Sequence, residues 1–350
     1  MNKSVYCIGL MSGTSLDGVD LVYVKFTIEK KYEFKIISCE TFPYSDAWLN
    51  RLKDAFHYNK KDLKQIDVDY GQYLGELIQK FIHKNNIKSL DFIASHGHTI
   101  HHKPNEEYTL QIGDGKTIAS NTKTKVICDF RSQDVALGGQ GAPLVPIGDK
   151  LLFNEYTYCL NLGGFANISF EQDDTRVAFD ICAVNTILNF YANKLGLAYD
   201  DKGIIAKSGK INTDLLSELN KLEFYKKSAP KSLGFEYVES ILLPLLTHFK
   251  LSERDLMCTY IEHIAIQITN NLTKQGHLLI TGGGVFNTFL IDRIRFHSSI
   301  EIIIPDVKTI DFKEALIFAF LGLRKAENKI NCLQSVTGAS KDHSSGVVFE

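Results

Sequence analysis

The sequence predicts a mixed α/β protein that is built from two related halves. Short apolar runs rich in β-branched and aromatic residues alternate with longer segments of helical periodicity, which is typical of sheets covered by helices. A strand–turn–strand pattern occurs near residues 10–20 and again near residues 160–170. We therefore expect the same structural plan to occur twice. The length of 350 residues is sufficient for two domains of ordinary size.

The first half begins with strands and continues with helices that alternate with further strands. The expected strands are Val5–Leu10, Val19–Phe26, Tyr32–Glu40, Ser89–Ala94 and Lys125–Asp129. The expected helices are Asp46–His57 and Asp62–Asn85, of which the second carries apolar residues at roughly helical spacing. This order favours a mixed sheet that starts with a hairpin.

The second half follows a similar order. The expected strands are Tyr156–Leu162, Asn167–Phe170, Val177–Asp180, His277–Thr281 and Glu301–Pro305. The expected helices are Asn185–Leu195, Val285–Arg293 and Asp311–Leu323. Glycine and proline cluster in Gly138–Pro143, which makes this segment the best candidate for a hinge.

Composition narrows the classes of function. The formal net charge is −2, so there is no global electrostatic reason to bind nucleic acid or an anionic membrane. The longest apolar run, Ala315–Leu323, has about half the length of a membrane span. The seven cysteines are odd in number, contain no CxxC pair and lie mostly in apolar runs, which favours reduced, buried thiols. We expect a soluble, cytoplasmic protein.

The strongest local motif lies in the turn of the first hairpin. Small residues there allow backbone N–H groups to approach an anion, and two hydroxyl side chains add donors. The candidate phosphate-binding residues are Gly13, Thr14, Ser15, Leu16, Asp17, Gly18, Val19 and Asp20. Asp17 and Asp20 could hold a hydrated Mg²⁺ opposite the phosphates. The alternative is a plain hairpin turn.

Two further glycine-rich loops follow predicted strands. Gly163 and Gly164, like the first turn, would bring small residues and backbone N–H donors to the end of a strand. Gly282, Gly283 and Gly284 would allow a flat ligand to lie on bare backbone. Neither a complete Walker loop nor a dinucleotide-binding fingerprint occurs in the sequence. Three such loops in one chain favour ATP as the ligand, with two hairpins at the phosphates and one turn at the nucleoside.

Several polar side chains follow strands and are candidates for chemistry. Asp180 could act as a general base at a strand end, although from spacing alone a helix N-cap is the favoured interpretation. Arg131 could bind a carboxylate in a bidentate geometry or form a structural ion pair. Glu314 is interpreted as a solvated or capping charge. The histidines of the 96–102 segment favour hydrogen bonding to a sugar over a metal site, because no further ligands stand at metal-ligand spacing.

Taken together, these motifs resemble the anhydro-N-acetylmuramic acid kinases, which belong to the actin/hexokinase/Hsp70-type ATPases. The stretches that carry the resemblance span nearly the whole chain: Gly9–Asp20, Ser95–His101, Gln111–Ala119, Asp129–Pro146, Leu160–Ser169, Phe179-Asp180, Asp201–Asn212, Gly282–Asn287, Asp311–Ala319 and Ser335–Ala339. The resemblance implies a two-lobed actin-like ATPase fold, a duplicated ribonuclease H-like fold, with an interlobe cleft. The lobes would cover residues 1–132, with a C-terminal helix 325–350 packed on them, and residues 133–324.

The resemblance also implies a reaction. Water would open the anhydro bridge of 1,6-anhydro-N-acetylmuramic acid at C1 while O6 takes the γ-phosphoryl group of ATP, and the product would be N-acetylmuramic acid 6-phosphate, in cell-wall sugar recycling. Asp180 would activate the water, and Gly13–Asp20 would bind the phosphates with Mg²⁺. The residues near the sugar would be Ser95, His96, His98, Arg131 and Asn185. The family further implies a homodimer.

One segment departs from the family pattern. Relatives commonly carry Phe-Asp-x-Gly-Pro-Gly-Asn, whereas this chain has Phe179-Asp180-Ile181-Cys182-Ala183-Val184-Asn185. The acid and the asparagine are retained, and the glycines and proline are not. Two alternatives therefore stay open: a kinase for another 1,6-anhydro sugar such as levoglucosan, and a non-catalytic ATP-binding relative.

Overall fold

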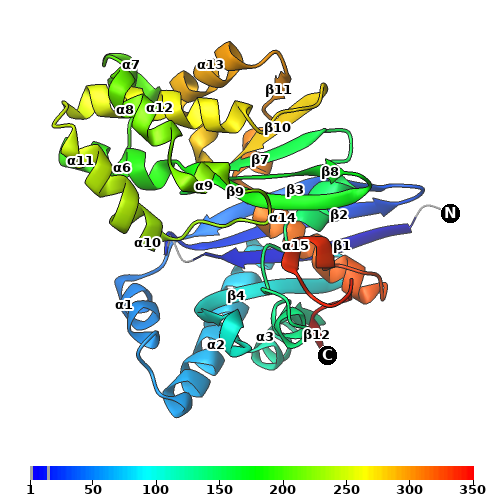
Figure 1. Cartoon of the computed structure of the whole chain (residues 1–350). Coiled ribbons are helices and arrows are strands. Elements are labelled where there is room, and N and C mark those ends of the chain that lie inside the picture. Colours follow the sequence, from blue (N-terminus) through cyan, green and yellow to red (C-terminus); the bar gives the residue numbers. More distant parts are fainter. Residues whose placement is uncertain (1–2, 14–15) are drawn as a thin grey trace. The chain divides into compact units, whose positions relative to one another are not determined.

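The structure, a computed structural model, describes residues 3–13 and 16–350. The chain forms two compact units (Figure 1): unit 1 contains residues 1–152 and 312–350, and unit 2 contains residues 153–311. These bounds differ from the expected ones, because residues 133–152 and 312–324 fall in unit 1. Contacts within unit 1 explain the difference. The Gln140 N–H donates to the Thr337 carbonyl at 2.7 Å, and Lys313 forms a buried ion pair with Asp149 at 2.7 Å.

Unit 1 is built on a seven-stranded mixed sheet in the order β12-β6-β4-β1-β2-β3, with β5 paired to β4. Its strands are β1 (Lys3–Ser12), β2 (Val19–Ile28), β3 (Tyr32–Phe42), β4 (Phe92–Lys103), β5 (Tyr108–Ile112), β6 (Val126–Cys128) and β12 (Val347–Phe349). β1 and β2 are buried along nearly their whole length, which explains their continuous apolar runs. The first three strands pair antiparallel, and β4 and β6 continue the sheet in parallel.

The helices of unit 1 cover this sheet and share its core. They are α1 (Asp46–Ala55), α2 (Lys60–Lys84), the 3₁₀ turn η1 (Pro104–Glu106), α3 (Gly115–Thr122), α4 (Ser132–Ala136), α5 (Pro146–Leu152), the part of α14 (Val307–Ala326) from Phe312 onward, and α15 (Gln334–Thr337). Asn59 caps α2 by accepting two backbone N–H bonds, and the apolar face of this helix, including Tyr70 and Leu74, is buried.

The expected C-terminal helix 325–350 is wrong. α14 ends at Ala326, and the remainder forms only the short α15 and the strand β12, which pairs antiparallel with β6. Gly338 and Gly346 adopt positive φ angles of 77° and 115° in this segment, and such backbone cannot continue a helix. The segment nevertheless belongs to unit 1, as expected.

Unit 2 is built on a five-stranded sheet in the order β11-β10-β7-β8-β9. Its strands are β7 (Tyr158–Leu162), β8 (Phe165–Gln172), β9 (Thr175–Ala183), β10 (His277–Thr281) and β11 (Glu301–Ile303). β7, β8 and β9 pair antiparallel, and β10 and β11 continue in parallel. This plan repeats the one in unit 1, so the mixed α/β class and the duplication that the two hairpins predict are both confirmed.

Helices make up most of the remainder of unit 2 and gather beside its sheet (Figure 1). They are α6 (Asn185–Lys194), η2 (Asp201–Gly203), α7 (Ile204–Lys207), α8 (Thr213–Asn220), α9 (Glu223–Lys226), α10 (Phe235–Tyr237), the π-helical turn η3 (Val238–Leu242), α11 (Leu243–His248), α12 (Glu253–Thr269), η4 (Gly283–Phe286) and α13 (Thr288–His297). α12 is buried nearly all round, including His263. It is the central helix of this unit's core.

The cysteines are free thiols, as expected, and all except Cys39 are buried. In the part of the chain that the structure describes, none of the helices combines the length and the hydrophobicity that a membrane crossing requires.

Candidate active site

The first predicted phosphate loop is the turn between β1 and β2. Thr14 and Ser15 lie outside the described residues. The Leu16 N–H donates to the Gly13 carbonyl at 3.3 Å, and Leu16 adopts a left-handed φ of 59°. A Cβ on Gly18 would lie 2.6 Å from the Phe42 carbonyl oxygen, so only glycine fits at this position. The described part therefore ends in a tightly packed Gly18, and β2 begins at Val19.

The two acidic residues of this turn have different surroundings. Asp17 is exposed in the turn. Asp20 lies on β2, and its carboxylate accepts a hydrogen bond of 2.5 Å from the Thr41 hydroxyl on β3. Among residues 3–13 and 16–350, neither acid belongs to a group of three potential metal ligands. Mg²⁺ usually keeps several waters and needs only one or two carboxylates, so these two acids could still contact a hydrated cation.

The histidine segment lies directly beside the first turn. It forms the first part of β4, and Ser12 at the end of β1 pairs with His98. The Ser12 hydroxyl donates to the Gly97 carbonyl at 2.8 Å and accepts from the Tyr70 hydroxyl at 3.0 Å. The turn and the histidine segment, which are 85 residues apart in sequence, are thus joined by a buried chain of hydrogen bonds.

His96 and Arg131 form a directed pair. The Arg131 Nε–H donates to His96 Nε2 at 3.0 Å, and His96 Nδ1 lies 2.9 Å from the Gly97 carbonyl. A carbonyl can only accept, so Nδ1 carries the ring proton and His96 is neutral. Burial, and then the Arg131 charge, hold the pKa of His96 well below its usual value, which agrees with this tautomer. Burial also lowers the pKa of Arg131 to about 10, so the guanidinium stays charged.

Two further predicted sugar-binding side chains on β4 are buried. Burial lowers the pKa of His98 to about 4, so its ring is neutral near pH 7. The Ser95 hydroxyl and His98 Nδ1 have no hydrogen-bond partner among the described residues. Unsatisfied buried polar atoms are rare in native proteins, and they mark positions where a ligand or water could supply the missing bond.

Glu314 is a polar residue whose proximity to Arg131 the sequence analysis did not detect. It projects from α14, is exposed, and lies close enough to Arg131, Lys313 and Asp17 to interact with their charges. Surrounding protein atoms raise the pKa of its carboxyl, and the two cations lower it. Its exposure agrees with the expected solvated charge, and its position near Arg131 and the first turn was not expected. Arg131 and Glu314 are 183 positions apart in the sequence, so their proximity could not be predicted from it.

The two glycine-rich loops of unit 2 meet at one sheet edge, as their positions after strands predict. Thr281 at the end of β10 pairs with Asn161 on β7, and a Cβ on Gly282 would lie 2.6 Å from the Asn161 Oδ1. Gly282 also has a φ of 83°, so it accepts no side chain without strain. A Cβ on Gly283, in contrast, would meet no atom within 4 Å, which leaves open space over the backbone.

The β7–β8 turn also supports the start of α6. The Gly164 carbonyl accepts from the Val184 N–H at 2.7 Å and from the Thr186 hydroxyl at 2.9 Å. The Gly163 carbonyl accepts from the Asn185 N–H at 3.3 Å. The glycines therefore hold Asn185 at the first position of α6 with their carbonyls, a role that the sequence analysis did not foresee.

Asp180 lies near the end of β9 and is held by a segment far along the chain. Its N–H donates to the Lys231 carbonyl at 3.0 Å, and its Oδ2 accepts from the Leu233 N–H at 2.9 Å. Burial raises the pKa of its carboxyl, and the Leu233 N–H lowers it to a smaller extent. Asp180 is not the helix N-cap that its spacing favoured, because Val184 occupies that position before α6. A half-buried carboxylate with one fixed oxygen and a raised pKa suits a general base.

The residues that replace the family's glycines and proline point away from solvent. Cys182, Ala183 and Val184, like the preceding Ile181, are all buried in the core of unit 2, and the Ala183 carbonyl accepts from the Tyr260 hydroxyl at 3.1 Å. Their apolar character is therefore explained by core packing. The unforeseen segment Lys231–Leu233 supplies the backbone contacts beside Asp180 instead.

The sequence matches to known proteins agree with one another. A sequence model described as anhydro-N-acetylmuramic acid kinase matches residues 5–350. The protein of that name from Pasteurella multocida is 35% identical, with 99% of this chain and 97% of the relative covered. The one from Mannheimia succiniciproducens is also 35% identical, with 98% of each covered. Among solved structures, component A of (R)-2-hydroxyglutaryl-CoA dehydratase from Acidaminococcus fermentans is 14% identical, with 92% of this chain and 99% of that chain covered and a TM-score of 0.48. On the sequence matches, this chain belongs to the anhydro-N-acetylmuramic acid kinase family.

Proposed function

We propose that this protein is an ATP-dependent kinase that hydrolyses and phosphorylates 1,6-anhydro-N-acetylmuramic acid. Water attacks C1, the bond between C1 and the bridging O6 breaks, and O6 takes the γ-phosphoryl group. The products are ADP and N-acetylmuramic acid 6-phosphate. Membership of the family over nearly the whole chain supports the substrate, and the geometry around Asp180 supports the chemistry.

The observation that carries the mechanism is the state of the Asp180 carboxylate. The Leu233 N–H fixes Oδ2, which leaves Oδ1 as the oxygen that accepts a proton from water. The raised pKa of this carboxyl makes it a stronger base than an exposed aspartate. A base of this kind contributes a factor of about 10² to 10⁴ to the rate. Asp180 therefore has both the orientation and the basicity that activation of water requires.

The remaining candidate residues divide into sugar and nucleotide contacts. Arg131, paired with neutral His96, offers a charged donor, and the unsatisfied Ser95 and His98 atoms suit the hydroxyl and amide groups of a sugar. We assign Asn185, held by the β7–β8 turn, to the sugar as well. The positive charge of Arg131 also suits the carboxylate of the lactyl group, which levoglucosan lacks together with the N-acetyl group.

ATP is proposed to contact the three glycine-containing turns. The phosphates would lie against Gly13–Asp20, Gly163 and Gly164, and the nucleoside against Gly282–Gly284, where Gly283 leaves bare backbone. Mg²⁺ retains several waters and needs only one or two carboxylates, so exposed Asp17 with Asp20 fits a water-mediated contact. When bound, the cation would neutralise charge on the transferred phosphoryl group.

The test follows both products of the reaction in water labelled with ¹⁸O. The purified protein with MgATP is given 1,6-anhydro-N-acetylmuramic acid, levoglucosan or no sugar, and ADP release is measured. We expect ADP release with the muramic acid alone, with ¹⁸O at C1 of the product and none in its phosphate. ADP release with levoglucosan and not with the muramic acid would show that levoglucosan, or a sugar like it, is the substrate. No stimulation of ADP release by either sugar would refute the kinase assignment. ¹⁸O in the phosphate would refute the attack of water at C1.

The family resemblance also supports a homodimer and a cytoplasmic location, and we include both in the proposal. Analytical ultracentrifugation of the purified chain tests the first, with a single species of twice the chain mass as the expected result. Fractionation of the producing cells tests the second.

A further inference from the structure

One cluster of ligand-type side chains in unit 1 lies outside the proposed kinase chemistry. Asp134, Cys332 and His343 are all buried, and their potential ligand atoms lie within 4.8 Å of one another. No other group of three such side chains comes this close within residues 3–13 and 16–350. Asp134 and Cys332 are 198 residues apart in the sequence, and Cys332 and His343 are 11 residues apart. The three residues therefore do not form a recognisable metal-binding motif in the sequence.

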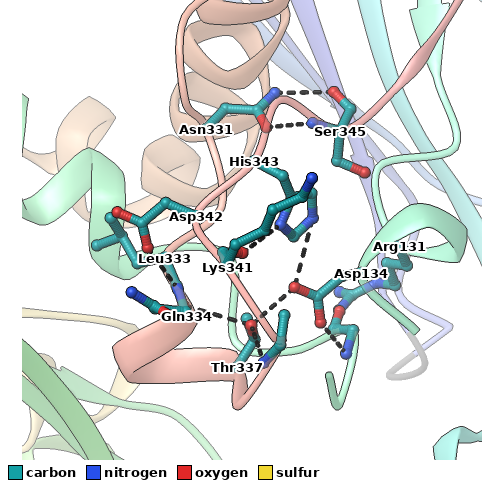
Figure 2. Close-up of polar contacts among 12 residues, drawn as sticks. Arg131, Asp134, Asn331, Leu333, Gln334, Thr337, Lys341, Asp342, His343 and Ser345 are labelled. Carbon is teal, nitrogen blue, oxygen red and sulfur yellow. Dashed lines mark hydrogen bonds and ion pairs between the residues drawn. The ribbon is translucent and has the colours of Figure 1, made fainter. Parts of the chain in front are cut away.

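Backbone contacts fix two of the three residues against each other. Cys332 and His343 form an isolated antiparallel bridge, in which the Cys332 N–H donates to the His343 carbonyl at 3.1 Å and the His343 N–H donates to the Cys332 carbonyl at 3.2 Å. The Asn331 side chain closes the same loop through two hydrogen bonds to the Ser345 backbone, of 2.9 and 2.7 Å (Figure 2). The thiol and the imidazole are thus brought together by a rigid loop.

The orientation of His343 leaves one ring nitrogen facing the cluster. Its Nδ1 lies 3.1 Å from the Lys341 carbonyl, which can only accept, so Nδ1 carries a proton. Nε2 points toward Asp134, 3.5 Å from Oδ1, and has no hydrogen-bond partner (Figure 2). The residue is only 5% exposed. If Nε2 carries no proton, its lone pair faces a carboxylate oxygen at close range, which is unfavourable unless a proton or a metal cation lies between them.

Asp134 is held from its other side. Its Oδ1 accepts from the Thr337 hydroxyl at 2.7 Å, and its Oδ2 accepts from the Gly141 N–H at 2.7 Å (Figure 2). Metal-binding histidines commonly donate their second N–H to a carbonyl, and metal-binding carboxylates are themselves hydrogen-bonded. Both His343 and Asp134 show this arrangement of outer contacts.

We propose that Asp134, Cys332 and His343 form a buried binding site for one divalent cation of the zinc class. A thiolate, an imidazole nitrogen and a carboxylate oxygen form a donor set that such cations prefer. On binding, the Cys332 S–H bond breaks, its proton leaves to solvent, and sulfur, Nε2 and Oδ1 each donate an electron pair to the metal. The thiolate and the carboxylate together balance the double positive charge.

The distances and charges around the cluster are compatible with this site. Metal–ligand bonds of about 2.0–2.3 Å in a tetrahedral arrangement bring ligand atoms to about 3.5 Å apart, so the side chains must close by about 1 Å. Burial and Asp134 raise the pKa of the Cys332 thiol to about 12, whereas Arg131 and Ser345 lower it. Coordination to a metal removes such a proton outright. Arg131 is the opposing cation nearby, and the carboxyl of Glu314 offsets its charge.

Such a metal would join the C-terminal segment to α4, next to Arg131. This inference does not depend on the proposed kinase reaction, because it concerns the architecture of unit 1. Its test therefore measures metal binding and not turnover.

The experiment is a titration of the full, reduced and metal-free chain with Co²⁺, a spectroscopic substitute for Zn²⁺. We expect one equivalent to bind, with a thiolate-to-cobalt charge-transfer band that Zn²⁺ abolishes. Cys332→Ser and His343→Ala should each lose the band. The matched controls, Cys39→Ser on β3 and His57→Ala after α1, should keep it, and Zn²⁺ should raise the melting temperature of the wild type and of these controls only.

Two results would overturn the proposal. The first is a wild-type chain that takes up no stoichiometric Co²⁺, which would leave a simple ion pair between His343 and Asp134. The second is a charge-transfer band that persists in Cys332→Ser, which would place the metal at another thiol. Circular dichroism establishes that each variant is folded, and His343→Gln provides a second, smaller change if His343→Ala does not fold.

Discussion

Replacing Asp180 by asparagine tests the central feature of the proposed mechanism. The amide keeps the shape of the side chain, and its carbonyl oxygen can still accept from the Leu233 N–H, now 2.9 Å from Oδ2. A hydrogen bond to a charged group contributes about 1.5–3 kcal/mol and one to a neutral group about 0.5–1.5 kcal/mol, so this contact weakens by about 1 kcal/mol. Removal of a half-buried charge offsets part of that loss. We therefore expect Asp180→Asn to fold.

Turnover should respond very differently. Loss of a general base lowers kcat by a factor of about 10² to 10⁴, or about 2.7–5.4 kcal/mol in the activation free energy. The assay is steady-state release of ADP with 1,6-anhydro-N-acetylmuramic acid. The matched control is Asp174→Asn, which makes the same charge change at an exposed turn position with a φ of 59° that asparagine tolerates.

The pH profile provides a second readout of the same group. Because burial raises the pKa of Asp180, the base becomes protonated at a higher pH than an exposed aspartate would. The wild-type rate should therefore fall as the pH drops through this raised pKa, and Asp180→Asn should lack that acidic limb. A folded Asp180→Asn protein with near-wild-type kcat would refute the assignment of Asp180 as the base.

Three further predictions concern stability, measured by urea unfolding. Gly282→Ala should lower the free energy of unfolding by about 1–3 kcal/mol, because the new Cβ would lie 2.6 Å from a side-chain oxygen on β7. Gly283→Ala faces open space and should change the free energy of unfolding by less than about 0.5 kcal/mol. Equal effects of the two substitutions would contradict the packing described. Lys313→Met should cost about 3–5 kcal/mol because it removes the cation that pairs with the buried Asp149 carboxylate. Adding Asp149→Leu should recover most of this loss, and no recovery would show that the loss has another cause. Burial lowers the pKa of His263 to about 3. Between pH 6.5 and pH 3 the unfolded chain therefore binds a proton at this residue that the native chain does not bind. The free energy of unfolding should fall by up to about 1.4 kcal/mol for each unit by which the pH drops in this range, as the contribution of His263 alone. His263→Gln should make that dependence shallower, and an unchanged slope would contradict the reasoning.

Local patterns in the sequence were sufficient for most elements of the two sheets. The strand His277–Thr281 was predicted to the residue. The first hairpin was predicted with its first strand two residues too short at each end and its second strand two residues too short at the outer end. Such elements are recognisable because β-branched runs and turn residues act over a few neighbouring positions. The prediction for the C-terminal segment was wrong because the structure of this segment depends on pairing between β12 and β6, which are more than two hundred residues apart in the sequence.

In the candidate site, the sequence predicted residue types but not the contacts between distant residues. The sequence marked the glycine turns, Asp180 and Arg131 as residue types suited to phosphate, water and sugar. It could not show that Leu233 orients Asp180 or that Glu314 lies near Arg131, because contacts between distant segments produce no periodic pattern in the sequence.

The sequence by itself thus determined the class of fold, the repeated hairpins and the family, since these follow from local propensity and from motifs that span the chain. Only the tertiary structure decided which polar groups face one another. It brought potential ligand atoms of Asp134, Cys332 and His343 within 4.8 Å of one another and left His343 Nε2 without a hydrogen-bond partner among the described residues. The physical reason is that such encounters arise from the packing of distant segments, which fixes burial, charge and orientation together.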